Sequence, residues 1–169
     1  VVQLLYAGHE TTRNLIGNGL FTLLRHPAEL ARLRRDPSLL PSAVEEMLRY
    51  EPPILFLSRV ALVDVELAGL SVRRGDLVHV NLASANRDPE HFADPDRFDV
   101  GRSENRHLTF GWGMHFCLGA HIARMEGRVA FETLLRRFSG IELVGPPPSW
   151  APATALRTLE TFPVRLTPA

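Results

Sequence analysis

The only cysteine of the chain, Cys117, lies in a loop in which glycines recur at positions 111, 113 and 119. A long amphipathic stretch follows the loop directly, so the thiol is predicted near the N-terminus of a helix. The helix dipole and the unpaired backbone N–H groups at that end stabilise a thiolate, which is a good metal ligand. A lone cysteine is more often a small buried apolar residue. The flanking residues therefore decide between the two interpretations.

The flanking residues favour a metal-bound thiolate. Glycine has no Cβ, so the backbone of this loop can approach a large flat partner closely, and a haem face is such a partner. Residues 110–124 read Phe-Gly-x-Gly-x-His-x-Cys-Leu-Gly-x-x-x-Ala-Arg, which resembles the haem-binding loop of the cytochrome P450 superfamily. The resemblance implies a haem b cofactor, iron protoporphyrin IX, with Cys117 as the axial iron ligand. It also implies haem contacts from Phe110, Gly111, His115 and Gly119.

A second signature, Ala-Gly-His-Glu-Thr-Thr at residues 7–12, interrupts a helical pattern. Glycine inside a helix costs about 1 kcal/mol relative to alanine, and a threonine hydroxyl can bond the carbonyl one turn back and bend the helix. A helix crossing that needs a small residue would explain the same pattern. The hexapeptide also matches the oxygen-activation motif of the superfamily. That resemblance implies that Glu10 and Thr11 deliver protons and that Ala7 and Gly8 lie close to the haem.

A third signature is formed by Glu46 and Arg49, which stand three residues apart and project from the same side of a predicted helix. Taken alone, such a pair occurs by chance in many helices. Here it resembles the Glu-x-x-Arg signature of the superfamily, whose buried pair is joined by an arginine from a later Pro-x-Arg-Phe segment. Arg97 supplies that arginine in this sequence. The resemblance implies a structural and not a catalytic role for all three residues.

Haem carries two propionates, and buried carboxylates need cationic or multi-donor partners. By the resemblance, Arg59 and His115 are these partners; the alternative for Arg59 is a surface arginine at a strand edge. The resemblance also places the lining of the substrate cavity at Leu55, Phe56, Ala155 and Leu156. Apolar residues in a sheet are more often part of the core, so that alternative stays open for each of them.

The hydropathy pattern predicts a mainly α-helical chain with a small antiparallel β-sheet, the class of the C-terminal part of the cytochrome P450 fold. Prolines separate the elements, because a proline removes a backbone donor and biases the preceding residue away from the α region. Helices are expected at residues 1–25, 28–35 and 42–50 and from just after Cys117 to about residue 138; the sheet is expected at 54–81 and terminal strands at 156–166. The last helix is expected to bury a face formed by Ile122, Met125, Val129, Leu134, Leu135 and Phe138.

Composition narrows the class of protein. The 169 residues are 45% apolar, enough for one core, and 19 basic residues balance 19 acidic ones, which argues against nucleic-acid binding. No run approaches the roughly 18 consecutive apolar residues of a membrane span, so no membrane partner is expected. One cysteine forms no internal disulfide, which favours a reducing compartment such as the cytoplasm. Because the first residues already have the pattern of a helix interior, the chain is expected to begin inside a helix. The resemblance implies that residues 1–169 are the C-terminal haem-binding portion of one cytochrome P450 domain, with the N-terminal half absent.

The resemblance implies a haem-thiolate monooxygenase of the soluble bacterial type, which inserts one oxygen atom from O₂ into a small apolar substrate, here a secondary metabolite. Electrons would come from NAD(P)H through a ferredoxin or flavodoxin with its reductase. Two alternatives remain: a peroxygenase or NO-reductase-like enzyme with the same cofactor, and a truncated, non-catalytic piece that cannot hold haem. The candidate docking charges for the redox partner are Arg102, Arg106, Arg124 and Arg128.

Overall fold

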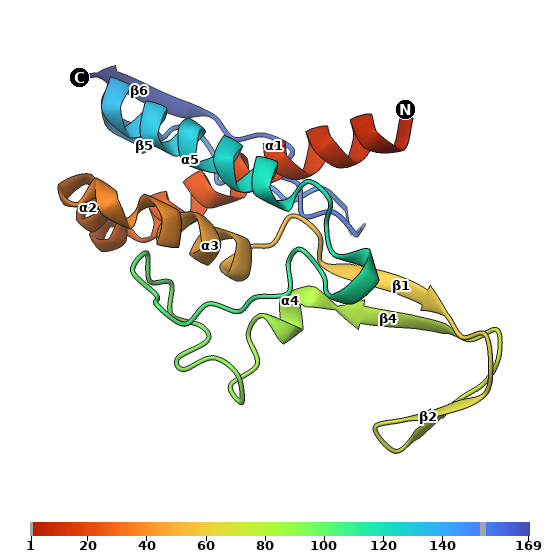
Figure 1. Ribbon diagram of the computed structural model, residues 1–169. Helices are drawn as coiled ribbons and strands as arrows, with labels where there is room; N and C mark the ends of the chain where they lie inside the picture. The colour runs from red at the N-terminus through yellow and green to blue at the C-terminus, as the bar shows by residue number, and fades with distance from the viewer. Residues whose placement is uncertain (1, 153–154) are drawn as a thin grey trace.

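Three helices form the centre of the molecule. A computed structural model describes residues 2–152 and 155–169 of the chain. In it α1 (Val2–Arg25), α3 (Leu40–Tyr50) and α5 (Ala120–Arg137) pack against one another, and the short α2 (Pro27–Arg35) lies at the end of α1. Figure 1 shows this helical layer at one side and a pair of thin β-ribbons extending away from it.

The helices end where the sequence predicts. Pro27 occupies the first turn of α2, and His26 before it has left the α region, which separates α1 from α2. A 3₁₀ turn, η1 (Pro37–Leu39), leads into α3, which stops before Pro52 and Pro53. The three predicted N-terminal helices are confirmed to within two residues at each end.

Within the described residues, the strands form three separate antiparallel pairs. Strand β1 (Phe56–Val60) pairs with β4 (Leu77–Asn81), and between them β2 (Val65–Leu67) and β3 (Leu70–Val72) form a hairpin. The turn of that hairpin uses Gly69 with φ +79°, a value that favours glycine. The third pair joins β5 (Phe138–Leu143) to β6 (Val164–Pro168). Two further short helices, α4 (Leu82–Ala85) and η2 (Gly113–His115), were not expected from the sequence.

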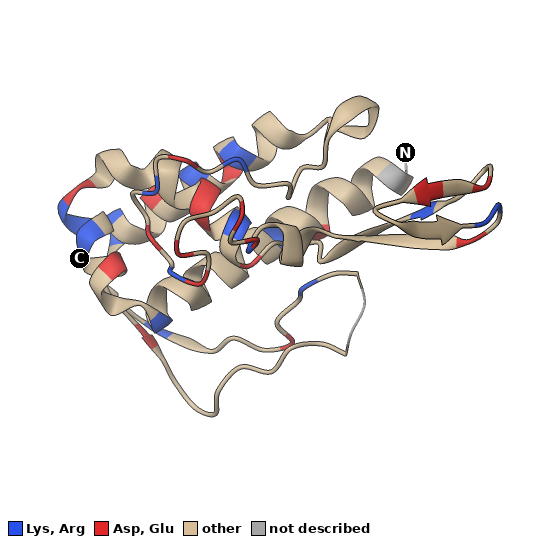
Figure 2. Ribbon diagram, turned by 90° about the horizontal axis from the view of Figure 1, so that it is seen from below, with Lys and Arg blue, Asp and Glu red and all other residues tan. Residues whose placement is uncertain are grey.

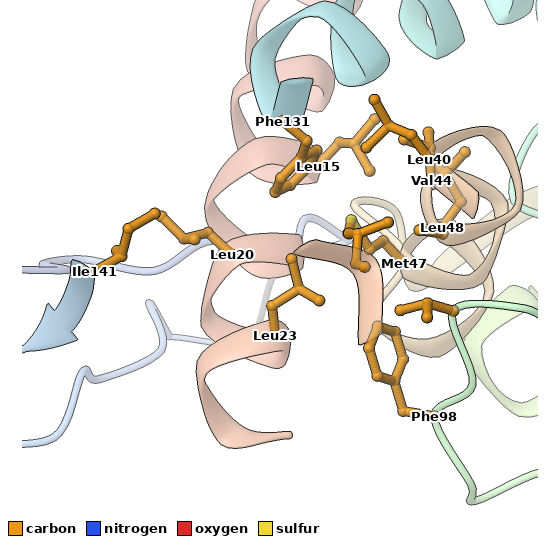
Figure 3. Packing of buried hydrophobic residues seen from close by; sticks show 13 residues of the cluster. Leu15, Leu20, Leu23, Leu40, Val44, Met47, Leu48, Phe98, Phe131 and Ile141 are labelled. Atoms are coloured by element: carbon orange, nitrogen blue, oxygen red, sulfur yellow. The ribbon is translucent and has the colours of Figure 1, made fainter. Parts of the chain in front are cut away.

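The hydrophobic core lies where α1, α3 and α5 meet. Leu15 and Leu23 of α1, Met47 of α3 and Phe131 of α5 are almost fully buried there, as Figure 3 shows. Gly19 lets α1 approach the other two helices, because a Cβ at this position would lie 2.7 Å from the Met47 sulfur and 2.9 Å from Phe131 Cζ. The core therefore depends on a missing side chain as well as on apolar ones.

Gly19→Ala is expected to lower the free energy of unfolding. Overpacking a filled core costs about 1–3 kcal/mol, which exceeds the gain of about 1 kcal/mol from replacing glycine in a helix. Met47 has a flexible side chain that can move aside, but the Phe131 ring is held by the core. Urea unfolding of wild-type and variant protein measures the difference, and a more stable variant would contradict this packing.

The predicted buried face of α5 is only half right. Leu134, Leu135 and Phe138 pack against the core, but Ile122, Met125 and Val129 are exposed. The helix instead buries its small residues, because Gly127 brings it so close to α1 and α3 that a Cβ would lie 3.1 Å from Leu15 and 3.2 Å from Val44.

The C-terminal strands also differ from the prediction. Strand β5 begins directly where α5 ends, and β6 begins only at Val164. Residues 156 and 159 instead form isolated bridges with Ile54 and Trp150. Among the described residues no helix has the length and hydropathy of a membrane span.

Candidate functional site

A cavity of about 540 Å³ opens beside the N-terminal half of α1. Its walls come from α1, the segment after α3, the loop that contains Cys117 and the first two turns of α5. Most of the lining side chains are aliphatic, with few polar groups, which is the usual composition of a cofactor or small-molecule pocket. The lining residues are Leu4, Ala7, Gly8, Thr11, Thr12, Leu15, Leu48, Pro53, Ile54, Leu57, Leu82, Thr109, Phe110, Gly111, His115, Cys117, Leu118, Gly119, Ile122, Ala123 and Glu126.

Two sequence signatures about a hundred residues apart meet at this cavity. From the first signature, Ala7, Gly8 and Thr11 line it. From the second come five further predicted residues, Phe110, Gly111, His115, Cys117 and Gly119. The structure thus brings together eight of the residues that the motifs singled out, and it does so around the one free thiol.

Cys117 lies three residues before the first residue of α5, and its thiol is exposed. Its backbone N–H donates to the carbonyl of Phe110 at 2.9 Å, which closes the loop behind it. Gly111 and Gly113 have φ values of +72° and +69°, conformations that strain any residue with a Cβ. A Cβ at Gly119 would meet nothing within 4 Å, so the backbone there borders open space.

Glu10 and Thr11, the two residues predicted to deliver protons, have different surroundings. Thr11 lines the cavity and its Oγ1 donates to the carbonyl of Ala7 at 2.7 Å, the local bond expected for a threonine inside a helix. Glu10 does not line the cavity; its carboxylate pairs with Arg13 at 2.6 Å on the outer side of α1. Adjacent residues on a helix point in different directions, so this split follows from the helical spacing.

Arg59 lies beside the cavity and not in its lining. It shares one face of β1 with Leu57, which does line the cavity, because side chains alternate along a strand. The Arg59 guanidinium donates to the carbonyl of Ser58 at 2.9 Å and is exposed. The propionate role of Arg59 stays a prediction.

None of the four predicted substrate-pocket residues lines the cavity described here. Phe56 is on the other face of β1, where its ring meets His79 edge to face at 5.0 Å. Leu55 donates its N–H to the carbonyl of Ala155 at 2.8 Å, and Leu156 forms a bridge with Ile54. Their neighbours Ile54 and Leu57 occupy the lining instead. The assignment of the four residues to a substrate cavity stays a prediction.

Several lining residues were not predicted, although some carried a signal. Leu4 and Leu15 continue the helical spacing of Gly8 and Thr11 on α1, so a projection of that helix would have found them. Leu82, in contrast, comes from the short helix α4 after a hairpin. No periodicity in the sequence links it to the site.

The predicted pair of Glu46 and Arg49 is present and fully buried. Arg49 donates from Nε and Nη2 to the two carboxylate oxygens of Glu46, each at 2.8 Å. Its remaining N–H groups bind three carbonyls of the segment after α4, those of Asn86 at 2.9 Å, Pro95 at 2.8 Å and Arg97 at 3.1 Å. The pair therefore fastens α3 to the irregular segment that precedes the Cys117 loop.

The arginine that joins this pair is Arg102, so the prediction of Arg97 was wrong. The Arg97 side chain is 62% exposed and lies 3.6 Å from Asp99, whereas the Arg102 side chain is 11% exposed and its Nε lies 3.2 Å from Glu46. The reason is that Phe98 enters the core, which turns the adjacent Arg97 outwards. Arg97 contributes its carbonyl, which accepts from Arg102 at 2.9 Å.

The four candidate docking arginines differ in availability. Arg106 and Arg128 are exposed, while Arg102 is held by Glu46. Arg124 is partly buried in an ion pair with Glu45. Acidic and basic residues lie interspersed along the helical part of the chain (Figure 2).

A second carboxylate, Glu45, forms a compact network next to the Cys117 loop. Arg124 donates to it from Nε at 2.7 Å and from Nη2 at 2.9 Å, and His107 Nε2 lies 3.1 Å away. His107 Nδ1 accepts the N–H of Thr109 at 3.3 Å, which leaves Nε2 as the protonated nitrogen that donates to Glu45. Burial opposes the ionisation of Glu45, but the hydrogen bonds from His107 and Arg124 outweigh it and lower the pKa of Glu45 from 4.5 to about 2.

This pKa predicts the pH range in which Glu45 stabilises the fold. A carboxyl whose pKa is lower in the folded chain contributes fully above its unfolded pKa, and the contribution is lost as the pH falls through the folded pKa. Glu45→Gln is therefore expected to cost about 1–2 kcal/mol at neutral pH, a figure reduced for solvent screening, and much less near pH 2. Urea unfolding at several pH values measures this difference; a cost that does not change with pH would contradict the assignment.

Known proteins match nearly the whole chain. The family model for cytochrome P450 matches residues 1–159. The chain is 46% identical over 166 residues to the polyketide biosynthesis cytochrome P450 PksS of Bacillus subtilis. The matched region covers 96% of the chain and 41% of PksS. It is 49% identical over 165 residues to the cytochrome P450 monooxygenase PikC of Streptomyces venezuelae, covering 96% of the chain and 40% of PikC.

Solved structures agree with the sequence matches. The crystal structure of P450BioI in complex with an acyl carrier protein ligated to hexadec-9Z-enoic acid superposes with a TM-score of 0.94 at 45% identity, over 98% of this chain and 43% of that one. The chain spans about two fifths of the length of the curated relatives it matches. The cavity, the motifs and these matches together show that the chain belongs to the cytochrome P450 family.

Proposed function

We propose that residues 1–169 are the C-terminal haem-binding portion of a single cytochrome P450 domain and that the complete protein is a haem-thiolate monooxygenase. The reaction would insert one oxygen atom from O₂ into a small apolar organic substrate. The name of the polyketide biosynthesis relative supports a secondary metabolite as that substrate. The observation that carries this proposal is that Thr11 and Cys117 line the same largely apolar cavity.

The residues at the cavity fit a haem group. One thiol faces the cavity from a loop whose glycines leave the backbone uncovered, and aliphatic side chains make up most of the remaining wall. Cys117 would hold the iron, with Phe110, Gly111 and Gly119 against the ring; His115 and Arg59 would bind the propionates. When bound, the haem supplies oxygen activation and electron transfer, chemistry that no protein side chain provides.

The side chains around the cavity would hold and move protons and exclude water. Thr11 Oγ1 donates to the carbonyl of Ala7, so its lone pairs remain able to accept a hydrogen bond from a proton donor; the hydroxyl would pass on its own proton and take the donor's in exchange. Glu10 is partly exposed on the outer side of α1 and would take protons from solvent for Thr11. Leu4, Leu15 and Ile54 line the same space and would keep bulk water out.

Thr11→Ala in the complete protein tests the proton-delivery role. General acid–base groups contribute about 10²-fold or more, so the product formed per NADPH consumed is expected to fall at least about tenfold. Thr11→Ser keeps the hydroxyl and is expected to retain most of the coupling. Full coupling in the alanine variant, measured as product against NADPH oxidation, would contradict the role of Thr11.

Electrons for this reaction would come from NAD(P)H through a ferredoxin or flavodoxin and its reductase. Arg106 and Arg128 are the exposed cations that remain from the four candidates for docking such an acidic partner. The single exposed thiol fits a reducing compartment such as the cytoplasm. The presence of Thr11 in the cavity lining favours O₂ activation over a peroxide-driven reaction, which needs no delivered protons.

A further inference from the structure

The loop that contains Cys117 is fastened at both ends to one carboxylate. On its N-terminal side, His107 Nε2 donates to Glu45 at 3.1 Å. On its C-terminal side, Arg124 donates to the same carboxylate at 2.7 and 2.9 Å. Glu45 therefore joins two points of the chain that are seventeen residues apart and that enclose the thiol.

Aromatic stacking connects this network to the cysteine itself. The Arg124 guanidinium carbon lies 4.4 Å from the centre of the Phe110 ring, which also contacts the Phe116 ring at 6.4 Å. The carbonyl of Phe110 accepts the N–H of Cys117 at 2.9 Å. Glu45 is thus connected to Cys117 by its hydrogen bonds to Arg124, by the stacking of Arg124 on Phe110 and by the backbone hydrogen bond between Phe110 and Cys117. Phe110 also lines the cavity.

We infer that Glu45 is a positioning residue for the Cys117 sulfur: by binding His107 and Arg124 together, it holds the loop in the conformation that presents the thiolate to the haem. This inference rests on the proposed function. The neighbouring Glu46 has a different task, because it is fully buried and binds Arg49, Arg102 and Asn105, none of which lies on the C-terminal side of the loop. The Glu45 side chain is 28% exposed, so the loss of its charge is tolerable for folding.

Glu45→Gln tests the inference in the complete haem-loaded protein. The amide keeps the size of the side chain and removes its charge. In the ferrous–carbonyl complex, the thiolate-type absorption band converts to the thiol type at a measurable rate. This rate is expected to rise about tenfold, because the substitution weakens charge-assisted hydrogen bonds. Glu104→Gln is the control: it removes the same charge from an exposed side chain three residues before His107 and is expected to leave the rate unchanged.

Hydrogen exchange of the peptide 107–120 provides a second readout that does not depend on haem. Glu45→Gln is expected to raise its exchange rate about tenfold more than that of peptides from the α1 and α3 core, whose exchange follows the loss of global stability. An unchanged rate in both measurements would overturn the inference, as would conversion that only follows global unfolding. If the wild-type protein shows no thiolate-type band at all, the proposed function fails, and hydrogen exchange still decides whether Glu45 holds the loop.

Discussion

Arg49→Met is expected to destabilise the fold by about 3–5 kcal/mol, because removal of one member of a buried ion pair leaves the other charge uncompensated. Arg49 and Glu46 are both 0% exposed. The same substitution orphans the carbonyls of Asn86, Pro95 and Arg97, each of which accepts from Arg49. The expected effect is a large fraction of the total stability of a typical domain, and denaturant unfolding measures it.

Arg97→Met is the matched control for this experiment. It removes the same type of side chain, but the Arg97 side chain is 62% exposed and lies beside Asp99, and only the backbone carbonyl of Arg97 binds Arg49. A surface substitution of this kind is expected to change the free energy of unfolding by less than about 0.5 kcal/mol. If Arg97→Met were as damaging as Arg49→Met, Arg97 and not Arg102 would be the arginine that completes the pair.

Cys117→Ser is expected to abolish thiolate ligation completely while leaving the polypeptide folded. The sulfur is exposed and contributes little to the core, so the free energy of unfolding of the haem-free protein is expected to change by less than about 0.5 kcal/mol. The serine hydroxyl is a harder and poorer donor to iron than a thiolate. The absorption spectrum of the ferrous–carbonyl complex measures the ligand directly.

His121→Gln is the control for ligand identity. His121 is exposed in the first turn of α5 and does not line the cavity, so its replacement is expected to keep the spectrum of the wild type. A thiolate-type spectrum in Cys117→Ser, or its loss in His121→Gln, would contradict the assignment of the ligand.

Local signals in the sequence predicted the N-terminal helices and part of the cavity lining. Proline positions and apolar spacing were sufficient for α1 to α3, because these features act within one or two turns. The two chemical signatures also identified eight lining residues of the cavity. Motifs of this kind report on the chemistry of single segments, and the fold then brings the segments together.

The errors concern contacts between segments. The exposure of Met125 and Val129 depends on how closely Gly127 lets α5 approach Leu15 and Val44, which the amphipathic pattern of one helix does not contain. The wrong prediction of Arg97 in place of Arg102 has the same origin. Both residues follow α4 in an irregular segment, and the burial of Phe98 decides which of the two side chains turns inwards.

The most direct test of this account is the carbon monoxide difference spectrum of the reduced, haem-loaded complete protein. The account predicts the red-shifted band of a ferrous iron bound by the Cys117 thiolate, together with one haem per polypeptide. A protein that binds no haem, or whose carbonyl complex lacks the band of a sulfur-ligated centre, would contradict it.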